Sequence, residues 1–215
     1  MEKANIRIDH VIATGATTLD LSFLQLASLP EDTFVHLTGL RKLYVNDNKL
    51  TSLPENIFAP LINLQELYIC DNLLTSLPEK IFAPLINLKL LTIAYNKLTS
   101  LPENIFTHLI NLQGLSINSN QFISLPEKIF APLVNLHKLC MSSNKLTSLP
   151  ENIFDSLTNL QKLFIGDNQL TSLPENIVAH LINLRRLDIW KNQLTGLPSS
   201  ILCCRQLTDF YYFGM

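Results

Sequence analysis

Residues 88–106 read LKLLTIAYNKLTSLPENIF, and this stretch decides the fold because near copies of it recur along the chain. Its second half recurs as TSLPENIF or a close variant, with copies that start at Thr51, Thr75, Thr99, Ile123, Thr147 and Thr171. One asparagine per copy keeps the same 24-residue step, at Asn48, Asn72, Asn96, Asn120, Asn144, Asn168 and Asn192. A fixed period of this length is typical of a protein built from stacked copies of one structural unit.

Each copy predicts one coil of a solenoid. Its L-x-L core alternates apolar and variable residues, so it forms a short strand with one buried face. The asparagine then turns the chain, because its amide can satisfy backbone groups of a buried turn as donor and as acceptor. The Leu-Pro step returns in extended geometry, since the residue before a proline avoids the helical region. Strand cores are expected at 19–21, 43–45, 67–69, 91–93, 115–117, 139–141, 163–165 and 187–189, with a degenerate ninth near 210–212.

Stacking of the coils buries the core. No coil covers its own apolar side, so neighbouring coils must do it, and their strands then pair in parallel about 4.8 Å apart. Nine such strands span about 40 Å. One aromatic side chain per coil is expected to stack into a spine, at Phe34, Phe58, Phe82, Phe106, Phe130 and Phe154, with Val178 and Leu202 closing it.

The pattern LxxLxLxxNxLxxLPxxIFxxLxNL, which runs from Leu19 to Leu207, resembles the leucine-rich repeat family in its 24-residue typical form. The resemblance implies an α/β-type solenoid, or horseshoe, with a parallel β-sheet on its concave face and short, mostly irregular turns on its convex face. We expect an N-terminal cap over residues 1–18, about eight coils over 19–207, and a C-terminal cap strand and tail over 208–215.

Two groups within that family are the most similar. The repeats are similar to those of variable lymphocyte receptors, but the chain lacks the cysteine-rich caps and the signal peptide of that group. It looks more like the leucine-rich repeat effector proteins that intracellular bacterial pathogens deliver into host cells. That resemblance implies a non-catalytic protein that binds a host protein.

Both ends of the array need covers of their own. Four apolar side chains near the N-terminus are expected to pack over the first coil: Ile6, Ile8, Val11 and Ile12. The last coil is one residue short, and Cys203 and Cys204 are expected to fill it. In the aromatic tail that follows, Phe210 and Tyr212 should face inward. Tyr211 and Phe213 should face outward. The tail is then a lid on a monomer, or alternatively the contact of an end-to-end dimer.

The outward positions of the strands vary, whereas the convex half of each coil is nearly copied. Side chains at i, i+2 and i+4 of a strand share one face, so the columns headed by Lys42, Tyr44 and Asn46 form one concave surface. Free drift of exposed residues would vary both faces, yet the convex glutamates from Glu55 to Glu175 are unchanged. We therefore predict a binding surface of about 600–800 Å², close to what one partner buries in a standard protein interface.

The residues expected to bind the partner are Lys42, Tyr44, Glu66, Tyr68, Lys138, Lys162, Phe164, Arg186, Asp188 and Trp190. They form two clusters, of which the C-terminal one holds Trp and Arg, the residue types that most often carry binding energy. Within it, Lys138, Lys162 and Arg186 lie on adjacent strands and repel one another. Three interpretations of this basic line remain open: a solvated face balanced by Asp167 and Asp188, recognition of an acidic protein surface, or binding of phosphate or nucleic acid.

Catalytic chemistry is not indicated. No glycine-rich phosphate loop or nucleophile motif occurs, and the cysteines match neither a disulfide framework nor a zinc site, so we expect no enzyme, no cofactor and no metal. The one candidate dyad is His137 with Cys140, which an open sheet would leave without a pocket. A formal net charge of −2 argues against a nucleic-acid partner.

The sequence also favours a location. No apolar run approaches the roughly 18 residues of a membrane span, and no secretory signal is present, so we expect a cytoplasmic protein or one delivered into the host cytosol without a Sec signal. We predict a protein–protein interaction module, and more specifically a secreted bacterial effector that acts on a host protein. The alternative is a receptor-like recognition module for a carbohydrate or a lipid headgroup.

Overall fold

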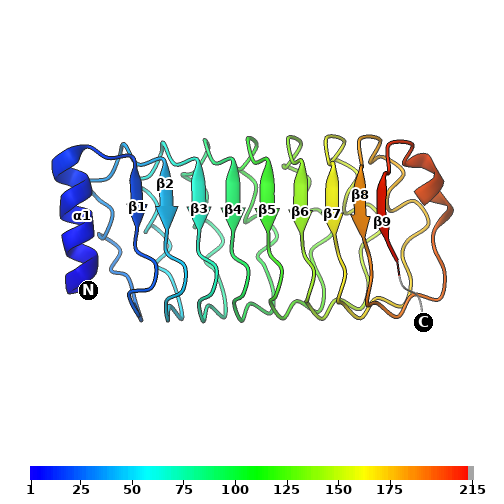
Figure 1. Ribbon diagram of the computed structural model, residues 1–215, viewed down its shortest axis with the longest axis horizontal. Coiled ribbons are helices and arrows are strands. Elements are labelled where there is room, and N and C mark those ends of the chain that lie inside the picture. Colours follow the sequence, from blue (N-terminus) through cyan, green and yellow to red (C-terminus); the bar gives the residue numbers. More distant parts are fainter. Residues whose placement is uncertain (213–215) are drawn as a thin grey trace.

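The L-x-L cores form short strands that pair in parallel with the equivalent residues of the next coil. The computed structural model describes residues 1–212, and within them nine strands form one sheet in chain order, a row that Figure 1 shows from the sheet side. Their bounds are β1 Thr18–Asp20, β2 Lys42–Tyr44, β3 Glu66–Tyr68, β4 Leu90–Thr92, β5 Gly114–Ser116, β6 Lys138–Cys140, β7 Lys162–Phe164, β8 Arg186–Asp188 and β9 Asp209–Tyr211. The middle residue of each strand from β1 to β8 is buried and its two neighbours are more exposed.

Each strand starts one residue earlier than the sequence predicted, as β2 does at Lys42 instead of Leu43. The pairing centres on the buried leucine and includes one residue on each side of it. Val45, the last residue of the expected core, is buried but lies beyond the paired segment. The leucine periodicity therefore locates the buried face correctly and the paired segment one residue too late.

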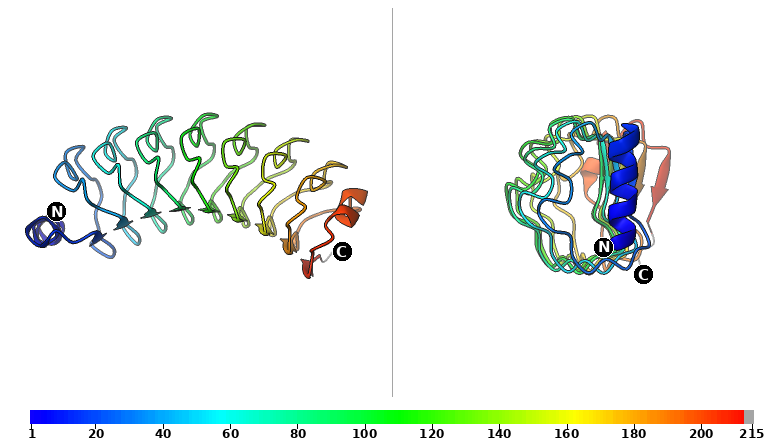
Figure 2. Two further views of the ribbon diagram at one scale, coloured as in Figure 1. Left: turned by 90° about the horizontal axis from the view of Figure 1, so that it is seen from above. Right: turned by 90° about the vertical axis from the view of Figure 1, so that its left-hand side faces the viewer.

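The predicted fold class is confirmed. Figure 2 shows the coils as a shallow arc with the strands along its inner side and irregular turns along its outer side. Among the described residues the helical elements are an α-helix, α1 (Glu2–Thr14), and a 3-10 helix, η1 (Ser199–Cys203), one near each end of the array.

The phenylalanine spine is confirmed from Phe34 to Phe154. Successive rings are stacked, with centroids 6.3–6.4 Å apart and interplanar angles of 11–15°. Val178 continues the buried row, but the expectation that Leu202 closes it is wrong, because that side chain is 84% exposed. The shortened last coil forms η1 there and buries Cys204 instead, while Cys203 is exposed.

A buried asparagine ties each coil to the one before it. The Asn96 amide donates to the carbonyl oxygens of Ile69, Ile93 and Ala94 at 3.1–3.2 Å, and its Oδ1 accepts the Leu74 backbone N–H at 3.1 Å. The equivalent set of four bonds is made by Asn48, Asn72, Asn120, Asn144, Asn168 and Asn192. The residue before each of these asparagines has φ between 51° and 55°, so the turn uses the left-handed region without glycine.

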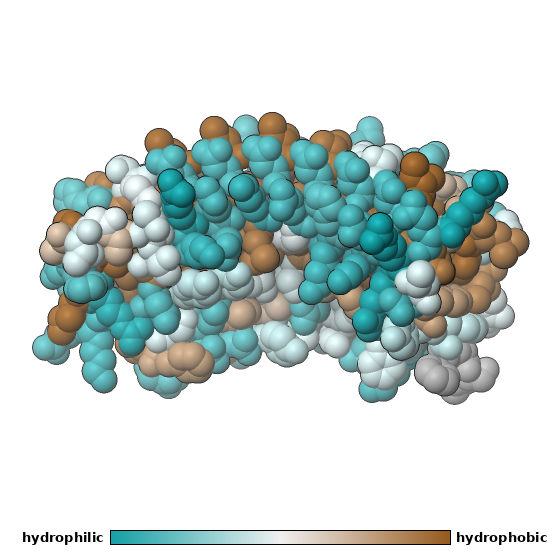
Figure 3. Space-filling view, turned by 45° about the horizontal axis from the view of Figure 1, so that its top comes forward, coloured by the Kyte–Doolittle hydropathy of each residue, from teal (hydrophilic) through white to brown (hydrophobic). Residues whose placement is uncertain are grey.

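A second, exposed row of asparagines runs along the rim that leads into the strands. The Asn87 amide, for example, donates to the Ile62 carbonyl oxygen of the preceding coil at 2.9 Å. The other members are Asn63, Asn111, Asn135, Asn159 and Asn183. Beside them lie the exposed apolar residues Ile62, Ile86, Ile110, Val134 and Ile182. Figure 3 shows hydrophobic side chains at regular intervals along the upper rim.

The N-terminal cover is α1, which ends at Gly15 with φ 65°. Ala4, Ile8 and Val11 share the buried face of the helix, so the expected packing of Ile8 and Val11 is confirmed. For Ile6 and Ile12 the expectation is wrong, because the helical period turns both side chains to solvent, where they are 62% and 45% exposed.

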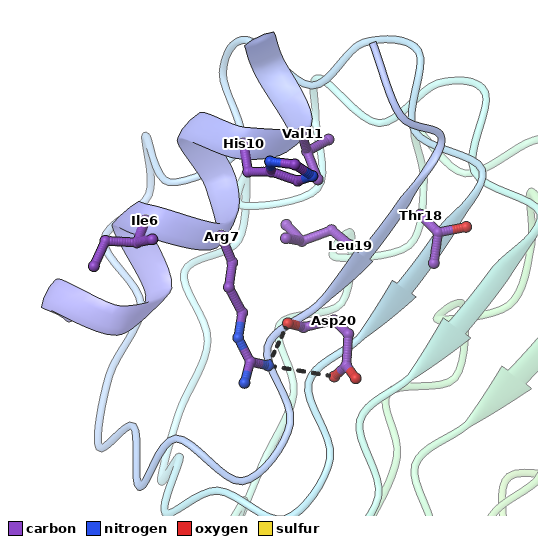
Figure 4. Close-up of a pocket in the computed structure, with 7 residues that line it drawn as sticks. All are labelled: Ile6, Arg7, His10, Val11, Thr18, Leu19 and Asp20. Atoms are coloured by element: carbon purple, nitrogen blue, oxygen red, sulfur yellow. Dashed lines mark hydrogen bonds and ion pairs between the residues drawn. The ribbon is translucent and has the colours of Figure 1, made fainter. Parts of the chain in front are cut away.

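The helix α1 also packs beside β1, the strand at the N-terminal edge of the sheet. Arg7 Nη1 donates to the Asp20 carbonyl oxygen at 2.7 Å and lies 3.9 Å from Asp20 Oδ1, across the open groove drawn in Figure 4. An unpaired strand edge invites pairing with another chain, so this arginine occupies an acceptor that would otherwise be open. Within this groove Arg7 is therefore already bonded to Asp20.

The C-terminal cover is β9. Phe210 is in register with the buried Leu187, as expected, but it is 39% exposed because no further coil packs on it within residues 1–212. Tyr212 is half-buried and packs against the core. The expectation for Phe213 lies outside the described residues. No helix among the described residues has the length and apolar character needed to cross a membrane.

Candidate protein-binding surface

The first and third residues of each strand form the concave face. Their buried middle residue points into the core, so the residues on either side of it project outward from the sheet. Nine of the ten residues predicted to bind a partner occupy such positions on β2, β3, β6, β7 and β8, and Trp190 follows β8 by two residues. The structure gathers them into two clusters toward opposite ends of the sheet, separated by the outward residues of β4 and β5, which are small except for Leu90.

The tyrosine cluster consists of Lys42, Tyr44, Glu66 and Tyr68. The two tyrosine rings are stacked, with centroids 4.6 Å apart. Lys42 Nζ lies 2.9 Å from Glu66 Oε1, and the Tyr68 hydroxyl donates to Glu66 Oε2 at 3.0 Å. Burial and the bond to Glu66 raise the pKa of Tyr68 to about 12, and the bond to Lys42 lowers the pKa of Glu66. Within this cluster the polar groups of Lys42, Glu66 and Tyr68 therefore bond to one another.

The basic–aromatic cluster consists of Lys138, Lys162, Phe164, Arg186, Trp190 and Tyr211. The Arg186 guanidinium carbon lies 5.1 Å from the centre of the Phe164 ring and 4.7 Å from the centre of the Tyr211 ring. Lys138 Nζ lies 5.7 Å from the centre of the Phe164 ring. A cation at these distances from an aromatic face is held by the electrostatic field of the ring.

The sequence predicted that Tyr211 faces outward in the aromatic tail, which forms a lid on a monomer or, alternatively, the contact of an end-to-end dimer. In the structure β9 pairs Tyr211 with Asp188, in the same column as Phe164, so the ring belongs to the concave face. The sequence does contain a signal for this position. The last coil is one residue short, so the step from Asp188 to the next residue of this column is 23 residues instead of 24, which leads to Tyr211. Arg186, which the prediction assigned to the surface, thereby gains a second aromatic neighbour.

Trp190 depends on a glycine that the sequence did not single out. A Cβ built on Gly166 would lie 2.5 Å from Trp190 Cδ1, so the indole covers this residue closely. Lys191 Nζ lies 4.4 Å from the centre of the indole ring, and the side chain of Trp190 keeps a substantial exposed surface. Glycine at position 166 therefore fixes where the indole lies on the concave face.

The basic line is not neutralised by ion pairs among residues 1–212. Lys138, Lys162 and Arg186 are direct neighbours across β6, β7 and β8, and none of them is within 4.0 Å of a carboxylate in that part of the chain. The acids that the sequence offers to balance them make other bonds: Asp167 accepts from the Ser143 hydroxyl at 2.8 Å and Asp188 accepts from the Trp190 backbone N–H at 3.4 Å. Burial raises the pKa of Asp188, and the bond to Trp190 and the charge of Arg186 oppose that change.

The thiols of the concave face are poor nucleophiles. Burial raises the pKa of Cys70 to about 11, and Asp71 adds to the effect. Burial also raises the pKa of Cys140, the member of the candidate dyad with His137. A nucleophilic cysteine needs a lowered pKa, so these environments act in the opposite direction. No group of three or more potential ligands for a metal occurs in the described part of the chain.

Comparisons with known proteins agree with this geometry. The family model described as "Leucine rich repeat" matches residues 14–69, 62–122 and 110–170, and a model for two copies of such repeats matches residues 158–211. A search among curated protein sequences gave no match.

Several solved structures superpose on the chain. A leucine-rich repeat protein from Leptospira interrogans has a TM-score of 0.82 and 34% identity over 92% of this chain and 49% of its own. Toll from Drosophila, in its complex with Spatzle, has a TM-score of 0.85 and 31% identity over 92% of this chain and 27% of its own. YopM from Yersinia enterocolitica has a TM-score of 0.67 and 33% identity over 93% of this chain and 39% of its own. The chain thus spans about half the length of the first of these proteins and less of the other two.

Proposed function

Because the chain belongs to the leucine-rich repeat family, we propose that it binds a protein partner against the concave face of its sheet. The observation that carries the proposal is the contrast between the two faces. The convex glutamates, of which Glu103 is one, are exposed and unchanged from coil to coil, whereas the concave columns, most of whose residues are half-buried, differ at nearly every strand. Exposure alone would leave both faces equally free to vary.

The residue types on the concave face support a protein partner. The face carries tyrosines at one end and Phe, Arg and Trp at the other, types that are enriched where protein interfaces hold most of their binding energy. Trp190 is 37% exposed, which leaves a large apolar ring in water unless a partner covers it. A complex with a protein ligand is known for one structural neighbour, Drosophila Toll with Spatzle.

The partner we propose is a host protein, with the chain acting as a bacterial effector by occupying a surface of that protein. The support is the similarity to leucine-rich repeat proteins from two bacteria, Leptospira interrogans and Yersinia enterocolitica. On this proposal the chain works in the host cytosol as a monomer without catalysis. Fractionation of infected cells with an antibody to the chain tests the location.

Capture from host-cell lysate, followed by mass spectrometry, tests the function. Trp190→Ala and Tyr68→Ala remove one large ring from each end of the concave face, and Glu103→Ala is the matched change on the convex face. We expect Trp190→Ala to weaken binding of the captured protein by about 2 kcal/mol or more, as truncation of an interface hot spot does. Circular dichroism should show all three variants folded.

Two outcomes would refute the proposal. One is a captured protein whose affinity, measured by calorimetry, is unchanged in both concave variants. The other is a loss with Glu103→Ala as large as with the concave variants. Binding to a glycan array or to lipid vesicles, together with no specific protein, would favour the receptor-like alternative.

A further inference from the structure

We infer that Arg186, held between Phe164 and Tyr211, is a binding site for a carboxylate in an acidic segment of the protein partner. The inference rests on the proposed function and names the chemistry that the C-terminal end of the concave face selects. It is argued from the position of the guanidinium, from its unsatisfied donors and from the charges around it.

The guanidinium is fixed in place before any partner arrives. Arg186 leaves β8, and its charged end lies 5.1 Å from the Phe164 ring centre of β7 and 4.7 Å from the Tyr211 ring centre of β9. A free arginine side chain loses rotamer freedom when it is immobilised by a ligand, and contacts to two rings remove part of that loss in advance. The planar group keeps its donors arranged as a fork that matches a carboxylate.

These donors are left without partners inside the chain. Arg186 Nε is buried and makes no hydrogen bond among the described residues. Its nearest candidates for an ion pair are Asp188 on the same strand and Asp209, its register partner on β9, and neither comes within 4.0 Å. A buried donor without an acceptor destabilises a protein, and Nε shows that the two rings, not hydrogen bonds, hold the group. Arg186 as a whole is only half-buried, so a carboxylate would approach the other nitrogens of the guanidinium.

The surroundings favour an anion of low charge. Lys162 is the register neighbour of Arg186, and Lys138 lies over the ring of Phe164, so three cations stand side by side. Asp188 and Asp209 lie within the same few residues, and they would repel a phosphate dianion or a nucleic-acid backbone more strongly than one carboxylate. The exposed indole of Trp190 adds an apolar contact beside the charge, which suits an acidic segment that also carries apolar side chains.

The single tryptophan of the chain, Trp190, serves as the reporter. The probe is a peptide of alternating Glu and Leu, titrated into the whole protein while Trp190 fluorescence is followed, with calorimetry as a second readout. The same peptide with Gln in place of Glu, inorganic phosphate and a single-stranded RNA are titrated in parallel. Arg186→Lys keeps the charge and removes the planar fork, and Arg185→Gln removes one positive charge from the exposed neighbouring residue as the matched control.

We expect saturable binding of the Glu peptide and none of the Gln peptide. Arg186→Lys should weaken binding by about tenfold, the lower end of what hydrogen bonds to a charged group contribute, and Arg185→Gln by less than about twofold. A loss in Arg186→Lys no larger than that in Arg185→Gln would show that attraction to positive charge, and not the planar fork, holds the peptide, and would overturn the inference. Stronger binding of phosphate or RNA than of the Glu peptide would overturn it in favour of those ligands, and no binding by either readout would overturn it outright.

The failure of this inference can be told apart from the failure of the proposed function. Suppose that Trp190→Ala abolishes capture of a host protein, while Arg186→Lys leaves the affinity for that protein unchanged. The concave face then binds a partner, but Arg186 does not bind a carboxylate of it. If neither variant changes the affinity, the proposed function fails as well.

Discussion

Replacing Asn96 by alanine should cost far more stability than replacing Asn87, although both side chains join neighbouring coils. Asn96 is buried and makes four hydrogen bonds, whereas Asn87 is exposed and donates one, to the Ile62 carbonyl oxygen at 2.9 Å. Both side chains bond from the same coil to the coil before it, so the two variants can be compared directly in one protein and one assay.

The magnitude follows from which groups the substitution leaves unsatisfied. The three carbonyl oxygens that lose Asn96 each keep another donor: the amides of Asn72 and Asn120 for two of them and the Asp71 backbone N–H for the third. The Leu74 N–H, by contrast, donates to Asn96 Oδ1 inside the core and would be left without an acceptor. One orphaned buried donor costs about 1–3 kcal/mol, and with the weakened carbonyl contacts we expect about 3 kcal/mol in total.

For Asn87→Ala, water can take the place of the amide at the exposed rim, so the expected loss is about 0.5 kcal/mol. Urea unfolding followed by far-UV circular dichroism measures both variants against the unaltered chain, and the slope with denaturant should not change. Losses that are equal, or a loss below about 1 kcal/mol for Asn96→Ala, would refute the reasoning, because the orphaned N–H would then have found water or another acceptor.

Three further changes test other parts of the structure. Gly166→Ala puts a methyl group where the Trp190 indole lies, 2.5 Å from its Cδ1 atom, so the ring must turn away; the fluorescence emission should shift while circular dichroism stays constant, and an unshifted emission would contradict the contact. The pKa of Tyr68 rises from 10.0 to about 12 on folding, so its contribution to stability is complete below pH 10.0 and is lost as the pH rises toward 12; thermal melts across that range should fall more steeply for the unaltered chain than for Tyr68→Phe. A thiol reagent at neutral pH should modify exposed Cys203 first and Cys70, whose pKa is about 11, much more slowly; Cys203→Ser should remove the fast phase, and a fast phase that persists would show that another thiol is the reactive one.

Most of the fold could be predicted because every coil repeats the same arrangement of buried residues. Leucine spacing gives the buried face of each strand, and the position of Phe106 in one coil predicts that of Phe130 in the next. The wrong predictions of side-chain burial concern the two ends of the array. Leu202 has the sequence position of a spine residue, but the missing residue of the last coil turns it outward and brings Cys204 inward.

The candidate surface was predictable as a set of columns, but its internal contacts were not. Periodicity assigns Arg186 to the concave face; it does not say which way a flexible side chain leans once it leaves the strand. That depends on the Phe164 and Tyr211 rings, and Tyr211 reaches the column only through the shortened coil. The cover that Trp190 forms over Gly166 likewise depends on one rotamer, which no pattern of residue types specifies.

The asparagine bonds reach only from one coil to the coil before it, and the strands likewise pair only with their immediate neighbours. Duplicating or deleting one internal coil, such as residues 75–98, would therefore recreate the same junctions on both sides. The tyrosine cluster and the basic–aromatic cluster would survive such an event unchanged, while the gap between them grew or shrank by one strand spacing, about 4.8 Å. Unequal recombination between the near-identical repeats can thus adjust the reach of this protein in fixed increments, fitting it to larger or smaller targets without redesigning either end.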